Sequence, residues 1–180
     1  GAAVAETAYY PALANLLNAV GSDLKPKVRC IMSLRDLGAG LPDGGLFTPD
    51  QLRGTRATDP LAVQTPARGA IEAKAVPDDA WATADSEQVT RYWRRYRQVL
   101  VTNYRHFVLV GEGADGSAAK LETYRLAESE ADFWAAAAHP RRTVEAHGDR
   151  FTEYLKRVML SDASLDTQEG VASFLASYAR

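Results

Sequence analysis

The sequence predicts a mixed α/β domain followed by a helical extension. Up to about residue 126, segments with strand-like alternation are interspersed with segments of helical spacing, whereas everything from Glu128 onward has helical spacing alone. We therefore expect an α/β domain over residues 1–126 and a helical extension or connector over residues 127–180. The 180 residues are ample for a sizeable core.

The expected elements follow from apolar spacing and from Gly, Pro and Asp as boundaries. The first helix ends at about Val20, where Gly21 stops it, and Pro11 complicates its start. A second helix is expected over residues 86–97, and residues 51–68 indicate a loop or loose hairpin arm. The expected strands cover residues 28–34, 69–76, 99–102, 106–110 and 121–126.

Two apolar stripes indicate two helices in the extension. Asp166 and Glu169 are typical of a capping box before the second of these helices. The first stripe consists of Phe151, Tyr154, Leu155, Val158 and Met159, and the second of Val171, Phe174, Leu175 and Tyr178.

The composition excludes several classes of protein. With 46% hydrophobic and 24% charged residues the chain is typical of globular proteins, yet no stretch approaches the roughly 18 to 20 apolar residues that cross a bilayer. The N-terminal apolar stretch contains Glu6 and lacks the basic region of a secretory signal, so a cytoplasmic location without a membrane partner is expected. The single cysteine, Cys30, excludes an intramolecular disulfide. The net charge of -2 argues against nucleic-acid binding by bulk charge.

The most informative segment is RGAIEAKAV, residues 68–76. On a strand, Glu72 and Lys74 point to one face while Ile71, Ala73 and Ala75 point to the other. A structural explanation for this acid and lysine is a cross-strand ion pair at a sheet edge. A chemical explanation is available because a second acid, Asp43, stands upstream in the turn sequence LPDGGLF.

The ordered residues Pro42-Asp43 and Glu72-Ala73-Lys74 resemble the motif of the PD-(D/E)xK nuclease superfamily. Gln88 and Tyr92 follow with a spacing similar to the QxxxY motif of its RecB-like branch. The segment from residue 24 to residue 93 also resembles the N-terminal nuclease domain of restriction–modification polypeptides, in which a nuclease precedes an N6-adenine DNA methylase.

The resemblance implies a restriction-endonuclease-like core, with a central mixed sheet flanked by helices and a helical C-terminal extension. It also implies a Mg²⁺-dependent DNA endonuclease domain that hydrolyses phosphodiester bonds in a restriction–modification or phage-defence enzyme. DNA is the expected partner, together with a covalently linked methylase or specificity domain beyond residue 180. The alternative is a non-catalytic DNA-binding or coupling module with a nuclease-like fold.

Each matching residue has a chemical role in this interpretation. Two carboxylates from neighbouring strands suit Mg²⁺, which prefers oxygen ligands and keeps several waters, and Mn²⁺ is expected to substitute. Asp43 and Glu72 are the candidate ligands, with the Ala73 carbonyl as a third. Lys74 would orient or deprotonate the attacking water and stabilise negative charge in the transition state.

Gln88 and Tyr92 are four residues apart and share one helix face. In the resembling family such residues position the phosphate at the active site. The structural alternative is that Asp85 and Gln88 form a capping box while Tyr92 belongs to the core.

Glu6 is a further candidate acid, because the spacing 6, 10, 13, 17 places it on the apolar stripe of the first helix. In related nucleases a glutamate from such a helix joins the metal site. The alternative is an acid in a frayed N-terminal turn, where the helix dipole favours it.

A basic segment follows the candidate catalytic residues. Residues 88–111 contain no acid and five arginines, so they carry +5 and leave -7 for the rest of the chain. Arginines contact phosphates and the interleaved aromatic residues can stack on bases, which indicates a DNA-binding face. We assign Arg91, Arg94 and Arg95 to this face, together with Arg68 at the start of the candidate catalytic strand. The structural alternative is a solvated helix face with aromatic core contacts.

Overall fold

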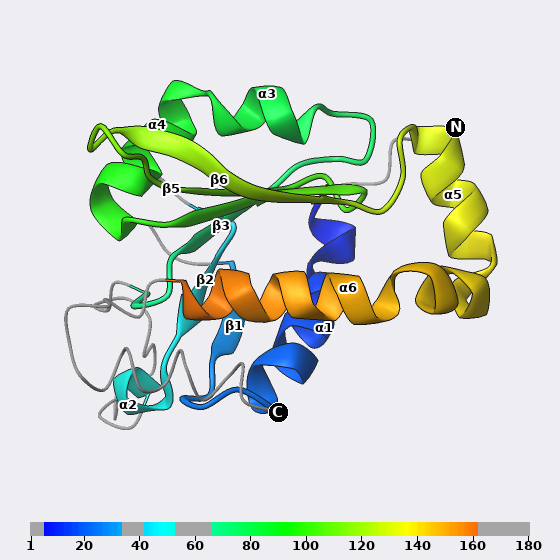
Figure 1. Ribbon diagram of the computed structural model, residues 1–180, viewed down its shortest axis with the longest axis horizontal. Helices are drawn as coiled ribbons and strands as arrows, with labels where there is room; N and C mark the ends of the chain where they lie inside the picture. Colours follow the sequence, from blue (N-terminus) through cyan, green and yellow to red (C-terminus); the bar gives the residue numbers. More distant parts are fainter. Residues whose placement is uncertain (1–5, 34–41, 53–65, 162–180) are drawn as a thin grey trace.

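The sheet at the centre of the molecule is covered by helices on both faces (Figure 1). The computed structural model describes residues 6–33, 42–52 and 66–161. In chain order the elements are η1 (Glu6–Tyr9), α1 (Tyr10–Ser22), β1 (Arg29–Met32), β2 (Gly44–Phe47), α2 (Pro49–Leu52), β3 (Ala70–Ala73), α3 (Ala80–Ala84), α4 (Glu87–Tyr96), β4 (Val99–Thr102), β5 (His106–Glu112), β6 (Ala118–Arg125), α5 (Glu130–Ala138) and α6 (Pro140–Leu160).

The sheet has six described strands in the order β1-β2-β3-β4-β5-β6. Every neighbouring pair is antiparallel except β3 and β4, which are parallel. A parallel pair needs a crossover connection, and α3 and α4 provide it. The sheet is therefore mixed, and β3 lies inside it between β2 and β4.

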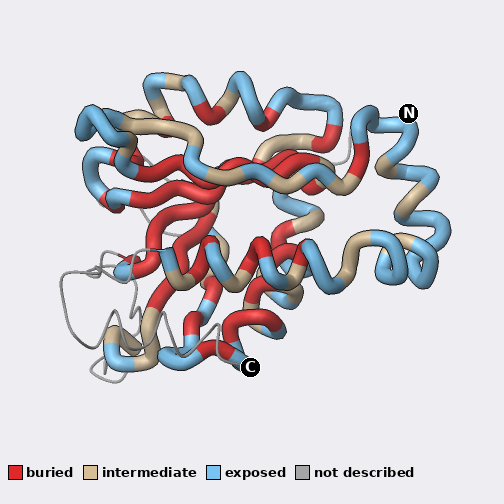
Figure 2. The backbone as a smooth tube through the Cα atoms, in the orientation of Figure 1, coloured by how far each residue is buried: buried red, intermediate tan, exposed pale blue. Residues whose placement is uncertain are grey.

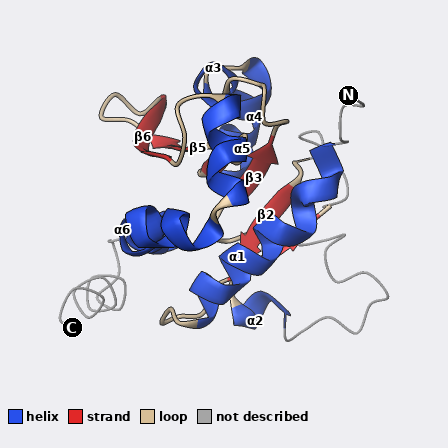
Figure 3. Cartoon of the chain, turned by 90° about the vertical axis from the view of Figure 1, so that its right-hand side faces the viewer, coloured by secondary structure: helices blue, strands red, loops and turns tan. Residues whose placement is uncertain are grey.

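Side-chain alternation divides the core into two layers. Ile71 and Ala73 of β3 pack in the layer that contains α1 and α6, whereas Ala70 packs with α3 and α4. Figures 1 and 3 both show α3 and α4 apart from α1 and α6. Because residues two apart share a face, Glu72 points to the α4 side like Ala70.

Burial follows this layered arrangement (Figure 2). Strands β2, β3 and β4 are buried along their whole length, whereas α5 contributes no buried residue. Helix α6 buries five residues against the sheet layer that contains α1, and these are the members of the first predicted stripe. The extension thus supplies part of the core through α6.

Local sequence explains the ends of the helix that follows β3. The side chain of Ser86 caps α4 by accepting a hydrogen bond from the Val89 N–H at 3.2 Å. At the other end, Arg97 has the left-handed backbone conformation, with φ of 62°. The helix predicted over residues 86–97 is therefore confirmed.

Most expected strands are confirmed, with changes at their ends. The strand predicted over residues 106–110 continues to Glu112, and the one predicted over 121–126 begins at Ala118. Helix α3 was not predicted, because the acids before it indicated a turn; the Asp79 side chain instead caps it by accepting from the N–H groups of Trp81 and Ala82.

Several predictions fall on residues outside the described ranges. They concern Asp166, Glu169 and the second apolar stripe of the extension. Much of the predicted loop over residues 51–68 also lies there, and its first two residues belong to α2. Among the described helices, none combines the length and apolar character needed to cross a membrane.

Candidate active site

Strand pairing brings Asp43 and Glu72 together. In the antiparallel ladder of β2 and β3, Gly44 pairs with Ile71 and Gly45 with Ala70. Asp43 directly precedes β2, and its side chain contacts β3 at Ala73, the residue after Glu72. The Asp43 carboxylate therefore lies beside the end of β3, although 29 positions separate Asp43 from Glu72.

Both oxygens of the Asp43 carboxylate have hydrogen-bond donors. Oδ2 accepts from the Ala73 N–H of β3 at 2.7 Å, and Oδ1 accepts from the Tyr10 hydroxyl of α1. Asp43 thus extends the β2–β3 ladder through its side chain, in the plane of the sheet. The Tyr10 hydroxyl approaches this carboxylate from the core layer that contains α1.

The carbonyl and the N–H of Ala73 both point towards β2. Lys74 N–H donates to Thr102 of β4 at 2.7 Å, so the Ala73–Lys74 peptide directs its carbonyl the opposite way, towards β2 and Asp43. The Asp43 carboxylate and the Ala73 carbonyl therefore lie together where β2 begins and β3 ends, one residue along the strand from Glu72.

Glu72 and Lys74 form an ion pair along one strand. Lys74 Nζ lies 2.6 Å from Glu72 Oε1, and the side chains are 27% and 2% exposed, respectively. The alternation prediction that both point to one face is confirmed. The alternative of a cross-strand pair at a sheet edge is wrong, because both residues belong to β3 or its direct continuation inside the sheet.

Helix α4 adds Gln88 and Tyr92 to this cluster. Gln88 Nε2 donates to the Tyr92 hydroxyl oxygen at 2.9 Å. Burial raises the pKa of Tyr92, and the hydrogen bond from Gln88 opposes that shift. The charges of Glu72 and Asp43 raise this pKa further and that of Lys74 lowers it, so the phenol lies within electrostatic range of all three.

The capping-box alternative for Gln88 is wrong. Ser86 is the residue that caps α4, and Gln88 uses its amide on Tyr92. Asp85 instead ends α3 and pairs with Lys120 on β6 at 2.5 Å. Tyr92 is 1% exposed and does belong to the core, as that alternative proposed, and its hydroxyl accepts from Gln88 within electrostatic range of Glu72 and Asp43.

Tyr10 is the site residue that sequence reasoning missed. It lies on the 6, 10, 13, 17 stripe used to argue for Glu6, and it is the residue from this stripe that contacts Asp43. The signal available in the sequence was that stripe alone, since a tyrosine in it is ordinarily a core residue. The backbone of Glu6 begins η1, while its side chain lies outside the described parts of the structure.

The arginines of the basic segment divide into two groups. Arg91, Arg94 and Arg95 are exposed on α4. Arg105 instead links distant segments of the chain. Its guanidinium donates to the main-chain carbonyls of Val76, Asp78 and Glu128 at 2.9 to 3.2 Å.

Arg97 and Arg68 are also separate from the exposed face of α4. Arg97 pairs with Glu112 at the end of β5. Arg68 is only 8% exposed in the turn before β3, so its assignment to the DNA-binding surface is corrected to a buried position. The candidate DNA-binding face is therefore confined to Arg91, Arg94 and Arg95.

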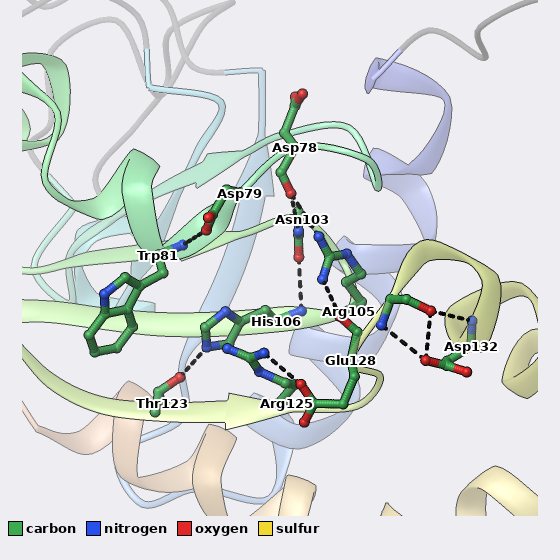
Figure 4. A network of polar contacts seen from close by, with 11 residues as sticks. Asp78, Asp79, Trp81, Asn103, Arg105, His106, Thr123, Arg125, Glu128 and Asp132 are labelled. Atoms are coloured by element: carbon green, nitrogen blue, oxygen red, sulfur yellow. Dashed lines mark hydrogen bonds and ion pairs between the residues drawn. The ribbon is translucent and has the colours of Figure 1, made fainter.

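Figure 4 shows the network around Arg105, which organises the side of the sheet near α3. Asn103 donates to the Asp78 carbonyl and accepts from the His106 N–H, and His106 Nε2 contacts the Thr123 hydroxyl at 2.5 Å. The His106 ring stacks on Trp81 with an interplanar angle of 3°. These contacts fix the turn between β4 and β5.

The donor chemistry at the site fits Mg²⁺. No group of three or more His, Cys, Asp or Glu side chains suited to a metal occurs within residues 6–33, 42–52 and 66–161. Mg²⁺ is commonly held by one or two carboxylates, with waters and substrate phosphates completing its octahedron. Asp43, Glu72 and the Ala73 carbonyl are a donor set of this kind.

Comparisons with known proteins return no relative. No protein-family model matches the chain. No curated protein and no solved structure matches it either.

Proposed function

We propose that the chain is a Mg²⁺-dependent DNA endonuclease domain of a restriction–modification or related phage-defence enzyme, with a PD-(D/E)xK core. The observation that supports it most is the proximity of Asp43, Glu72, Lys74 and Tyr92, which come from the segment before β2, the end of β3 and helix α4. A structural ion pair would need only Glu72 and Lys74. It would not account for a second carboxylate beside the end of β3 or for the nearby glutamine–tyrosine pair on α4.

In this proposal Asp43, Glu72 and the Ala73 carbonyl hold the metal ion. When bound, Mg²⁺ would neutralise charge on the phosphate and make a water molecule more acidic. Lys74 is the more exposed member of its ion pair with Glu72. In the proposal it orients the attacking water and offsets charge on the phosphate oxygens.

Tyr92 and Gln88 serve the phosphate. The raised pKa of Tyr92 keeps its phenol protonated at neutral pH, and Gln88 occupies its oxygen as a donor. In this proposal the Tyr92 hydroxyl donates its proton to the phosphate when substrate is bound. A neutral donor at this position binds an anionic phosphate without adding a second cation beside the metal.

Helical geometry distinguishes the three exposed arginines. Arg91 and Arg95 follow Gln88 by three and seven residues, so they share its side of α4. Arg94 follows by six residues, about 240° around the helix, and points away from that side. Arg91 and Arg95 are therefore placed to contact backbone phosphates that flank the scissile one, whereas Arg94 is not.

Plasmid nicking in Mg²⁺ tests the catalytic proposal. We expect Asp43→Asn and Lys74→Ala each to lower the nicking rate by at least about 100-fold, the scale of losing one transition-state electrostatic contact. The chain offers a matched control, because Asp23-Leu24-Lys25 repeats the acid-x-lysine pattern in an exposed turn. Asp23→Asn and Lys25→Ala should leave the rate unchanged.

The outcomes separate the proposal from its alternative. Activity that survives both site substitutions would refute the site assignment. Salt-dependent DNA binding without cleavage in Mg²⁺ or Mn²⁺ would instead support a non-catalytic DNA-binding module. In either case Arg91→Ala and Arg95→Ala should each weaken DNA binding more than Arg94→Ala does. Each should also reduce the slope of log affinity against log salt concentration by about 1, which corresponds to the loss of one phosphate contact.

A further inference from the structure

Tyr10 links the first helix to the acidic end of β2. It is the first residue of α1, and its hydroxyl donates to Asp43 Oδ1. The ring is 9% exposed and belongs to the core layer formed by α1 and α6. The packing of this layer therefore sets the direction from which the hydroxyl approaches Asp43.

Two hydrogen bonds on different oxygens define the orientation of a carboxylate. A carboxylate offers about four lone-pair positions, and the Tyr10 hydroxyl and the Ala73 N–H use one on each oxygen of Asp43. One lone pair on each oxygen remains. Rotation about the last side-chain bond would break both hydrogen bonds, so the direction of the remaining lone pairs is fixed.

The main-chain donor alone would not achieve this. With only the Ala73 N–H, the Asp43 carboxylate keeps one oxygen in place while the other swings about it. The fixed position of Oδ1 thus depends on Tyr10. Outer-sphere donors of this kind orient metal ligands, and their removal commonly lowers metal affinity by about 10- to 100-fold.

We propose that Tyr10 is a positioning residue of the metal site, holding Asp43 in the orientation that binds a divalent cation. This inference rests on the proposed function, because it takes Asp43 as a metal ligand. It adds α1 to the site and assigns to Tyr10 the place that the sequence had suggested for Glu6. Tyr10 itself does not contact the metal or the DNA in this proposal.

Mn²⁺ titration without DNA tests the inference on the full chain. Free Mn²⁺ is measured by its electron paramagnetic resonance signal as protein is added. We expect Tyr10→Phe, which keeps the buried ring and removes the hydroxyl, to raise the Mn²⁺ Kd by about 10-fold. Tyr9→Phe is the matched control: it makes the same change one residue earlier, where the ring contacts Tyr104 and Trp134 and not Asp43, and its Kd should equal that of the wild type.

The results distinguish positioning from a structural role. A structural role predicts that Tyr10→Phe lowers the melting temperature while the Kd stays unchanged, and that result would overturn the inference. Loss of binding in Asp43→Asn is expected, and it assigns the Mn²⁺ to this site. A wild-type chain that binds no Mn²⁺ would overturn both the metal site and the role of Tyr10. A chain that binds Mn²⁺ with the expected Tyr10 dependence but cleaves no DNA would refute the nuclease alone.

Discussion

The ion pair between Glu72 and Lys74 allows a stability measurement to separate a functional site from a structural one. The two partners are unequally buried, with Glu72 2% and Lys74 27% exposed in their side chains. Removing the lysine leaves a carboxylate inside the sheet without this cation. Removing the charge of the glutamate leaves a lysine that can extend into water. The two substitutions should therefore differ in their effect on the free energy of unfolding.

Breaking a fully buried pair costs about 3 to 5 kcal/mol, and solvent screening at the partly exposed lysine reduces this to about 2 kcal/mol for Lys74→Met. For a chain of this size the melting temperature should then fall by about 4 to 8 °C. Glu72→Gln should change stability by less than about 1 kcal/mol, since replacing the charge relieves the cost of burying it. The double variant should be more stable than Lys74→Met alone.

Thermal and urea unfolding, followed by circular dichroism, measure these differences, and plasmid nicking is measured on the same samples. We expect Glu72→Gln to abolish nicking although it retains stability, because the carboxylate is needed for the metal and not for the fold. If Glu72→Gln destabilises the chain as much as Lys74→Met does, the pair is structural and the reasoning is wrong.

Three further substitutions test how the surrounding elements are held. Ser86→Ala should cost about 1 kcal/mol in urea unfolding, because it removes the cap of α4; an unchanged midpoint would contradict that assignment. Asn18→Ala should cost about 1 to 3 kcal/mol, because the Asn18 amide bonds both the N–H and the carbonyl of Cys30 on the edge strand β1. Burial, assisted by the charge of Arg125, lowers the pKa of His106 below its usual 6.5, so the unfolded chain binds the proton more readily. The contribution of His106 to the free energy of unfolding should therefore be fully present above pH 6.5 and decrease as the pH drops towards the folded pKa. The free energy of unfolding of His106→Asn should fall less than that of the wild type between pH 7.5 and pH 5.5.

Several parts of the fold were predictable because they depend on neighbours in sequence. The alternation of residues 70–74 places Glu72 and Lys74 on one face, and the four-residue spacing of Gln88 and Tyr92 places them on one helix face. Both expectations agree with the observed contacts. The helix α3 was missed for a local reason, because an aspartate before a short helix and an aspartate in a turn have the same sequence pattern.

The burial of Arg68 and the internal contacts of Arg105 were not predictable in the same way. An arginine in a basic segment is ordinarily exposed, and only the packing of distant segments around it determines whether its guanidinium reaches solvent. Arg105 contacts carbonyls that lie 23 to 29 positions away in the chain. A count of arginines along the sequence therefore overestimated the candidate DNA-binding face.

The sequence by itself determined the types of most elements, the shared face of Glu72 and Lys74, and the shared helix face of Gln88 and Tyr92, because each follows from a period of two or of about 3.6 residues. Only the tertiary structure decided that the Asp43 carboxylate lies beside the end of β3 and bonds the Tyr10 hydroxyl. Strand register and helix packing join residues about 30 positions apart, and their free energies come from burying whole faces of the sheet. No local pattern in the chain encodes which hydroxyl meets which carboxylate.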